Sequence, residues 1–389
     1  MDLEVQLLNE ILNFKVEMVP DETRFWMVRT KKGYFYDEFL GKKFIALAWN
    51  NITRETNLSD EENLSNLIQK EYPEIRRPRT VINKCKSFIY DMKKGDIVVI
   101  PNKGTAKVAF VRVGDYFEDD SKTIEIEKEV IKSIENNDVR IKDVSCPYKK
   151  RREIEILKVM DSENINYNLY RAITSYHGIS NLDDCSRFIL SAIYNVYTFN
   201  NDLNIVFNVR KKTPISPLEL SGMLYGTTKY LCEIGIPEEN ISTQININSP
   251  GPIDFAIVDV FNYLKDNWMI FAGILVAFSG GSIASVKING IPDIMKNILS
   301  IKTLHEKDKL ENERLKLENK EKELELIDKK IELINKIRAS GINPEALTGS
   351  LETVIQSANN LEICSSNSPN GETNIDNAFP VDDEESELE

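Results

Sequence analysis

The sequence predicts a multidomain α+β protein that starts with a small β-barrel and has a long charged helix towards its end. Alternating apolar runs separated by turn residues fill the first 160 residues, and a mixture of helical and alternating patterns continues to residue 250. An uncharged stretch and then a heptad pattern follow. A chain of 389 residues is long enough for two or three such domains.

The barrel is expected over residues 1–160. Its strongest signal is "KKGDIVVIPNKGTAKVAFVRVGDYF", where apolar runs at 97–100 and 108–113 flank a Pro-Asn-Lys-Gly turn and predict a β-hairpin. Further strands are expected at 24–30, 44–49 and 152–159. Helices are expected after Ser59, a plausible N-cap, and at about 79–92. Strands that surround two helices are typical of a small barrel.

A small α+β domain is expected over residues 161–250. The segments "YNLYRAITSY" and "DDCSRFILSAIYNV" have helical patterns, and a hairpin is predicted to turn at Asn200–Asp202. The next helix should begin after Ser216, with Pro217 at its first position, and stop at Gly235. The short strand "STQININ" closes this domain.

The rear of the chain divides into three predicted segments. Within residues 251–300, the stretch 267–286 has no charge, so it is either a bilayer span or a buried or re-entrant hairpin packed through its glycines in an oligomer. Residues 301–338 are expected to form a coiled-coil helix, because apolar residues recur every seven positions, and we expect a homo-oligomer through residues 303–338. These residues are Leu310, Leu317, Leu324 and Ile331. Residues 339–389 are expected to be a disordered acidic tail.

Charge and cysteine content limit the possible functions. The net charge is −13, but residues 340–389 carry eleven acidic and no basic residues, whereas residues 1–160 carry 29 basic and 28 acidic ones. The acidic balance therefore does not exclude nucleic-acid binding by the front domain. Five cysteines and two histidines lie far apart, so we expect no metal site, no cofactor and no disulfide framework. The first residues do not read as a secretory signal, which predicts a cytoplasmic protein, with inner-membrane association through 267–286 as the alternative.

Four motifs occur in order in the front domain: "RFWMVRT", "FIALAWN", "KKGDIVVIPNKGTAKVAFVRVGDY" and "KKRREIEIL". Together, over about residues 20–160, they resemble the PUA-like, EVE-type modules of bacterial modified-DNA-dependent restriction proteins and related defence proteins. Residues 46–49, 95–101 and 152–157 correspond to the three recurrent strand motifs of these modules. In the last motif Ile156 replaces a tryptophan, which weakens the match at any pocket.

The resemblance implies that the front domain holds a modified base flipped into an aromatic cage. Stacking and hydrogen bonds to the Watson–Crick edge would offset the lost base stacking. Trp49 is the first candidate, because the polar Asn50–Asn51 pair places it at a strand end, and Asn50 would read the base edge. The other cage candidates are Trp26, Tyr34 and Tyr36. Aromatic residues that alternate along strands are also typical of a core, and this alternative stays open.

A basic stretch with interleaved aromatic residues lies beside the candidate cage, in "RRPRTVINKCKSFIYDMKKGD". Basic groups close to aromatic rings suit a phosphate backbone with an unstacked base. A solvated helix face is the alternative. The candidate phosphate-binding residues are Arg76, Arg77, Arg79, Lys84, Lys86 and, in the hairpin turn, Lys103.

Catalytic motifs are missing from the sequence. It contains neither a phosphate-binding Gly-x-x-x-x-Gly-Lys-Ser/Thr loop nor a Gly-x-Ser-x-Gly elbow. After Asp202, Asn208 stands where a nuclease would carry an acidic ligand, and His177 has no second histidine nearby. We therefore predict a protein without catalytic residues that senses a modified base or nucleotide and acts through its oligomerising, membrane-associated rear part in anti-phage defence. The alternatives are a modification-dependent nuclease with a degenerate site that uses Asp202 and Glu219, or a soluble coiled-coil adaptor.

Overall fold

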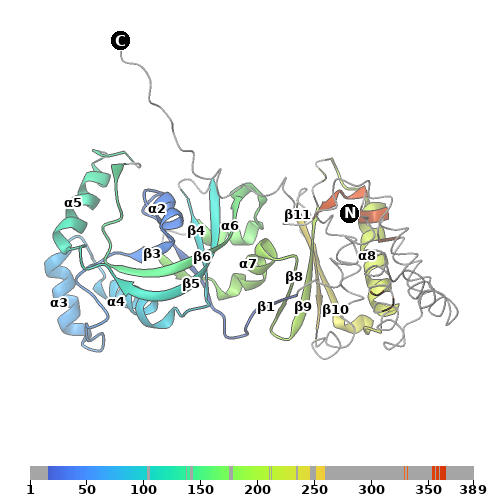
Figure 1. Cartoon of the computed structure of the whole chain (residues 1–389), viewed down its shortest axis with the longest axis horizontal. Helices are drawn as coiled ribbons and strands as arrows, with labels where there is room; N and C mark the ends of the chain where they lie inside the picture. The colour runs from blue at the N-terminus through green and yellow to red at the C-terminus, as the bar shows by residue number, and fades with distance from the viewer. Residues whose placement is uncertain are drawn as a thin grey trace, which may run out of the picture. The chain divides into compact units, whose positions relative to one another are not determined.

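The computed structural model of the chain describes residues 16–102, 106–136, 138–140, 143–174, 178–209, 211, 213–233, 235–245, 251–258, 328, 331, 353–354, 356–358 and 360–364. They form two compact units (Figure 1). The front unit comprises residues 22–193, and the second unit joins residues 16–21 to 194–258 and 353–364. Both units combine helices with a sheet, so the predicted α+β class is confirmed.

The front unit is built on a six-stranded sheet in the order β3-β6-β5-β4-β2-β7. Only β2 and β4 are parallel, and the predicted hairpin is present as the antiparallel pair β4–β5. The long strands β5 and β6 slip in register after Phe110 and after Val113, and such irregularities bend and twist a sheet. The strands are β2 (Phe25–Val28), β3 (Phe44–Leu47), β4 (Ile97–Pro101), β5 (Lys107–Glu118), β6 (Lys150–Asp161) and β7 (Ile179–Asn181).

The sheet of the front unit curls into a half-barrel and does not close. Within the described part of the chain, β3 and β7 are its two edges. The closed barrel expected from the sequence is therefore replaced by a curled open sheet. The bulged β5–β6 ribbon carries the curl, and helices α3, α4 and α5 lie around one end of it (Figure 1).

Helices complete the core of the front unit. The helix expected after Ser59 begins one residue later, because the Asp60 carboxylate caps it by accepting the Asn63 N–H (3.3 Å). The helix expected at about 79–92 is α4 followed directly by a π-helical turn, Ser87–Asp91. The helices are α2 (Tyr36–Gly41), α3 (Glu61–Glu71), α4 (Pro78–Lys86), α5 (Ile124–Glu135), α6 (Tyr167–Ile173) and α7 (Ser186–Ile193).

The front unit extends further along the chain than the sequence predicts. Strand β7 pairs antiparallel with β2 through Ile179 and Val28, and the Asp183 carboxylate accepts the Phe25 N–H (2.8 Å). The segment 161–193 is therefore part of the front unit, and the boundary lies after Ile193 instead of near Met160.

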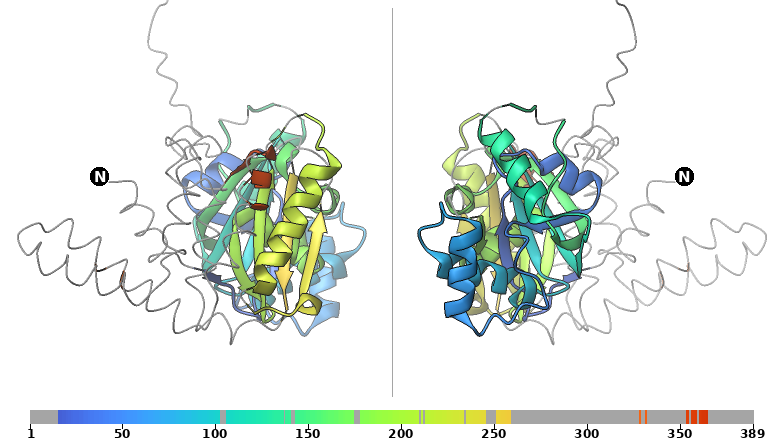
Figure 2. Two further views of the ribbon diagram at one scale, coloured as in Figure 1. Left: turned by 90° about the vertical axis from the view of Figure 1, so that its right-hand side faces the viewer. Right: turned by 90° about the vertical axis from the view of Figure 1, so that its left-hand side faces the viewer.

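The second unit has a sheet in the order β1-β8-β9-β11-β10, and helix α8 (Pro217–Glu233) lies across one face of it (Figure 2). The predicted hairpin is confirmed as β8–β9. Its turn residues Asn200 and Asn201 have φ of 53° and 66°, as a type I′ turn requires. The strands are β1 (Glu17–Met18), β8 (Val196–Phe199), β9 (Asp202–Val209), β10 (Ile241–Ile245), β11 (Gly251–Ile257) and β12 (Ile363–Cys364).

Two segments of the second unit contradict the sequence prediction. Residues 251–257, expected to begin an apolar segment, form β11 and pair with β9. Residues 353–364, expected in a disordered tail, contribute β12 to β9 and pack on α8. A Cβ on Gly226 would lie 2.9 Å from a methyl of Val354, so this contact needs a glycine. The described ends at Val258 and Thr353 thus belong to one unit.

The uncharged stretch 267–286 lies outside the described residues. Of the heptad region 303–338, the structure describes Asp328 and Ile331, and both are helical. The rest of the expected tail, apart from 353–354, 356–358 and 360–364, is also outside the described residues. In the described part of the chain, no helix combines the length and apolar character needed to cross a membrane.

Candidate functional site

The candidate site is centred on Trp49, which follows β3 and has an unusual backbone. Its φ is +68°, in the left-handed region that bulky residues rarely adopt. Backbone of this kind costs about 1–3 kcal/mol and persists only where surrounding contacts impose it. Two buried charged side chains, Glu127 and Lys150, impose it here.

Glu127 holds the amide side of the Trp49 backbone. It lies in the first turn of α5, is 3% exposed, and accepts hydrogen bonds from the N–H of Trp49 (2.7 Å) and of Asn50 (2.8 Å). The Tyr72 hydroxyl donates a third (2.7 Å), and burial raises the pKa of that hydroxyl. A buried carboxylate is tolerated when donors surround it in this way.

Lys150 holds the carbonyl side of the same backbone. Its side chain is completely buried, and its ammonium donates to the carbonyl oxygens of Trp49 (2.6 Å) and Ile52 (2.8 Å). Burial lowers the pKa of Lys150. Burial also raises the pKa of the Cys85 thiol to about 11, so this neighbour is an unreactive thiol. We call Glu127, Tyr72 and Lys150 the Trp49 clamp.

The Trp49 ring is half-buried and faces a cation. The ammonium of Lys84, on α4, lies 5.6 Å from the ring centroid, a cation–π distance. Burial lowers the pKa of Lys84 as well. The clamp therefore holds an aromatic ring that has a positive charge over one of its faces.

The two asparagines after Trp49 have opposite environments. The Asn50 side chain is 4% exposed, and its amide is used by the backbone: it donates to the carbonyl of Pro147 (2.8 Å) and accepts the Lys149 N–H (2.8 Å). In the described structure, neither polar atom of the Asn51 amide has a hydrogen-bond partner, although both are shielded from solvent. Asn51, not Asn50, has hydrogen-bonding capacity left for a ligand.

The other predicted cage residues are placed in or against the core. Trp26 is 4% exposed and its indole N–H donates to Asp96 (2.9 Å). Tyr36 is buried, which raises the pKa of its hydroxyl. Tyr34 is half-buried and packs against the same core. Of the predicted cage residues, Trp49 alone contacts both the clamp and Lys84.

A second aromatic and basic group lies where the 49–54 loop ends. Tyr90, in the π-helical turn, is 45% exposed and its hydroxyl donates to the Arg54 carbonyl (2.8 Å). The Arg54 guanidinium lies 5.9 Å from the centre of the Tyr116 ring, and the buried Arg152 lies 5.5 Å from it. The Glu118 carboxylate fixes this end by accepting the Arg54 N–H (2.8 Å).

The predicted phosphate-binding residues lie mainly on and before α4. Arg76, Arg77 and Lys86 are exposed and have no ion-pair partner among the described residues. Arg79 is also exposed but pairs with Glu61 (2.8 Å). Lys103 lies outside the described residues. Of these cations, Lys84 is the one that the described structure places against Trp49, and the unpaired cations lie on the same helix or just before it.

The nuclease alternative uses Asp202 and Glu219, and both lie in the second unit. Asp202 begins β9 and pairs with Phe199 in the β8–β9 hairpin. Glu219 forms a capping box at the start of α8: it accepts the Ser216 N–H (2.9 Å), and the Ser216 hydroxyl accepts the Leu218 N–H (3.2 Å). It also pairs with Lys211 (2.6 Å), whose hydrogen bond lowers the pKa of Glu219. His177 lies outside the described residues. No group of three or more metal-ligating side chains occurs among the residues that are described.

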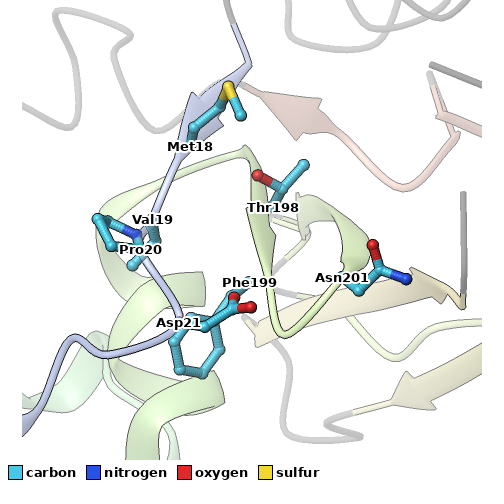
Figure 3. Close-up of a pocket in the computed structure, with 7 residues that line it drawn as sticks. All are labelled: Met18, Val19, Pro20, Asp21, Thr198, Phe199 and Asn201. Carbon is cyan, nitrogen blue, oxygen red and sulfur yellow. The ribbon is translucent and has the colours of Figure 1, made fainter. Parts of the chain in front are cut away.

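A separate hollow of about 380 Å³ lies in the second unit (Figure 3). Its walls come from residues 18–21 and from the β8–β9 hairpin. Asp21 is the one ionisable residue of the described lining, and its carboxylate already accepts the Asn200 N–H (2.8 Å). The hollow therefore offers a mainly apolar surface with little capacity for specific polar recognition.

Comparison with known proteins adds one family. A family described as a domain of unknown function (DUF8426) matches residues 26–167, a range that contains Trp49, Lys84 and the whole Trp49 clamp. This part of the chain is therefore similar to that family, and the match covers less than half of the chain. No curated protein and no solved structure matches.

Proposed function

We propose that the front unit binds nucleic acid and holds one unstacked base against the Trp49 ring. The observation that carries this proposal is the Trp49 clamp, which forces a half-exposed tryptophan into a left-handed conformation next to Lys84. Backbone outliers of this kind cluster at ligand sites. An unstacked base binds to an aromatic face, and its phosphate binds to a nearby cation.

The proposed role of each residue follows from the exposure of its side chain and from its unused hydrogen-bonding groups. Trp49 stacks on the base, and the Asn51 amide, which gives up no hydrogen bond when it rotates, reads the base edge. Lys84, Arg76, Arg77 and Lys86 contact phosphates. Asn50, Trp26 and Tyr36 support the site from the core, because their polar groups or rings are buried.

The proposal also includes the type of module that the front unit forms. The four sequence motifs support a PUA-like, EVE-type module, and the curled half-barrel is compatible with it. A modified base is the ligand that this resemblance implies. Since stacking favours every base, discrimination would come from the polar contact of Asn51.

We also propose that the rear of the chain relays binding by self-association, in anti-phage defence. The support is the seven-residue spacing of apolar residues from Leu310 to Ile331 and the uncharged stretch 267–286. Pairing of both β11 and β12 with β9 limits the membrane version. A chain that crossed a bilayer once between them would separate two strands of one sheet, so the membrane version of the proposal requires the chain to return to the side that it left.

The test of the proposed function is a salt titration of oligonucleotide binding by the full-length protein. Replacing Trp49 by alanine should weaken binding about 5- to 150-fold, because stacking of one base contributes about 1–3 kcal/mol. Lys84→Ala should reduce the slope of log K against log[salt] by about 0.7–0.9. Trp49→Phe, which keeps an aromatic face, is the matched control. Equal affinity of Trp49→Ala and the unaltered protein would refute the proposal.

A further inference from the structure

We infer that the front unit takes a single strand of at least two nucleotides and not an isolated nucleotide or an intact duplex. This inference rests on the proposed function and names its substrate class. The observation behind it is the second aromatic and basic group, at the far end of the 49–54 loop. A single base stacked on Trp49 would make no use of this group.

The second group offers the flat faces of a tyrosine ring and of an arginine guanidinium. Tyr90 is 45% exposed, and its hydroxyl, tied to the Arg54 carbonyl at 2.8 Å, fixes how the ring is held. Arg54 is exposed above Tyr116, whose ring also has Arg152 within 5.5 Å. Tyrosine rings and arginine planes are the groups on which bases of single strands stack. Tyr90 also lies in a π-helical turn, a geometry frequent at functional sites.

The two groups offer two separate stacking faces. Lys84 contacts Trp49 and Tyr90 contacts Arg54, and Lys84 and Tyr90 lie six positions apart on the continuous segment of α4 and the π-helical turn. Trp49 and Arg54 are the two ends of the 49–54 loop. A ligand that uses both faces must supply at least two bases, which a mononucleotide cannot do.

Charge and stacking both favour a single strand as the occupant. Arg76, Arg77 and Lys86 are exposed on the α3–α4 connection and on α4, and no described acidic side chain pairs with them. Two stacking faces can act together only on bases that are already unstacked, whereas a duplex would have to lose the stacking of two steps. A single strand meets both requirements without that cost.

The inference is tested by fluorescence anisotropy of the full-length protein with a labelled ten-nucleotide single strand of mixed sequence. Tyr90→Ala should weaken binding about 5- to 150-fold, whereas Tyr90→Phe, which keeps the ring, should bind within about twofold of the unaltered protein. Tyr167→Ala removes a tyrosine that is 60% exposed on α6, away from α4 (Figure 1), and should have no effect. A duplex of equal length and a mononucleotide mixture should compete at least about tenfold less well than the unlabelled strand.

The outcomes separate the inference from the proposed function. If Trp49→Ala weakens binding but Tyr90→Ala does not, or if the duplex or the mononucleotides compete as well as the strand, the single-strand inference is wrong and the proposed function stands. If no oligonucleotide binds at moderate salt, the proposed function itself is wrong.

Discussion

Replacing Glu127 by glutamine tests whether the Trp49 clamp holds the site together. The substitution removes a buried charge and places an NH₂ group where the carboxylate accepts hydrogen bonds of 2.7, 2.8 and 2.7 Å from Trp49, Asn50 and Tyr72. It also leaves Lys150 as a buried charge without this counter-charge. Hydrogen bonds to a charged group contribute about 1.5–3 kcal/mol each, and removing one of two coupled buried charges costs about 3–5 kcal/mol. Since the glutamine oxygen retains part of the bonding, we expect a loss of about 3–5 kcal/mol in the free energy of unfolding.

Urea unfolding measures this loss. In a Trp268→Phe background, the remaining tryptophans, Trp26 and Trp49, both lie in the front unit and report its unfolding alone. With a slope of about 2 kcal/mol per M, the midpoint should fall by about 1.5–2.5 M. Glu129→Gln, an exposed glutamate on the same helix, is the control and should leave the midpoint unchanged. A shift of less than about 0.5 M for Glu127→Gln would show that the clamp does not impose the Trp49 conformation.

Three further predictions concern stability. Asn50→Ala should lower the free energy of unfolding by about 2–4 kcal/mol because buried backbone groups lose their partners. Asn51→Ala should leave it unchanged or raise it, since the Asn51 amide is shielded from solvent and has no described partner; equal urea midpoints for the two variants would contradict this. Gly226→Ala should loosen the packing of Val354 on α8 and speed proteolysis near residue 353, because the new Cβ would meet Val354 at 2.9 Å; unchanged proteolysis would count against it. Because the pKa of Cys85 is raised to about 11, its contribution to stability is complete below pH 9 and is lost as the pH rises through 11, so Cys85→Ala should make stability fall less steeply between pH 9 and 11, and parallel curves would refute this.

Local patterns predicted much of the fold. Alternating apolar residues on both sides of a turn located β4 and β5, and the Ser216–Pro217 start and Gly235 stop located α8. These signals depend on residues close in sequence, so the sequence contains them in full. The open, curled form of the front sheet and its extension to β7 depend on register slips and on pairing between distant strands, which no local pattern specifies.

The candidate site was predicted only in part, because its supports are distant charges. Trp49 was identified from its position at a strand end, but Glu127 and Lys150 contact it from 78 and 101 positions away. Lys150 lies in the run "KKRR", which is typical of a solvated surface. One signal was present: Glu127 shares helical spacing with Val130, Ile131 and Ile134, so a glutamate interrupts an apolar stripe.

The packed segment 353–364 was missed because its surroundings are acidic and polar. Its buried residues Val354, Ala358 and Leu361 recur at helical spacing, a pattern too short to outweigh the composition around it. Its strand, β12, is two residues long and pairs with β9. Tertiary contact thus decided the structure of a segment whose local preference is weak.

The central claim is that the clamp presents the Trp49 ring for stacking with a base. Fluorescence of the full-length protein in the Trp268→Phe background during titration with a single-stranded oligonucleotide tests this most directly, with Trp49→Phe in the same background as the comparison. We predict quenching in the Trp268→Phe protein that disappears in Trp49→Phe, while that variant still binds by anisotropy. Quenching that persists in Trp49→Phe, or binding with no quenching at all, would contradict the claim.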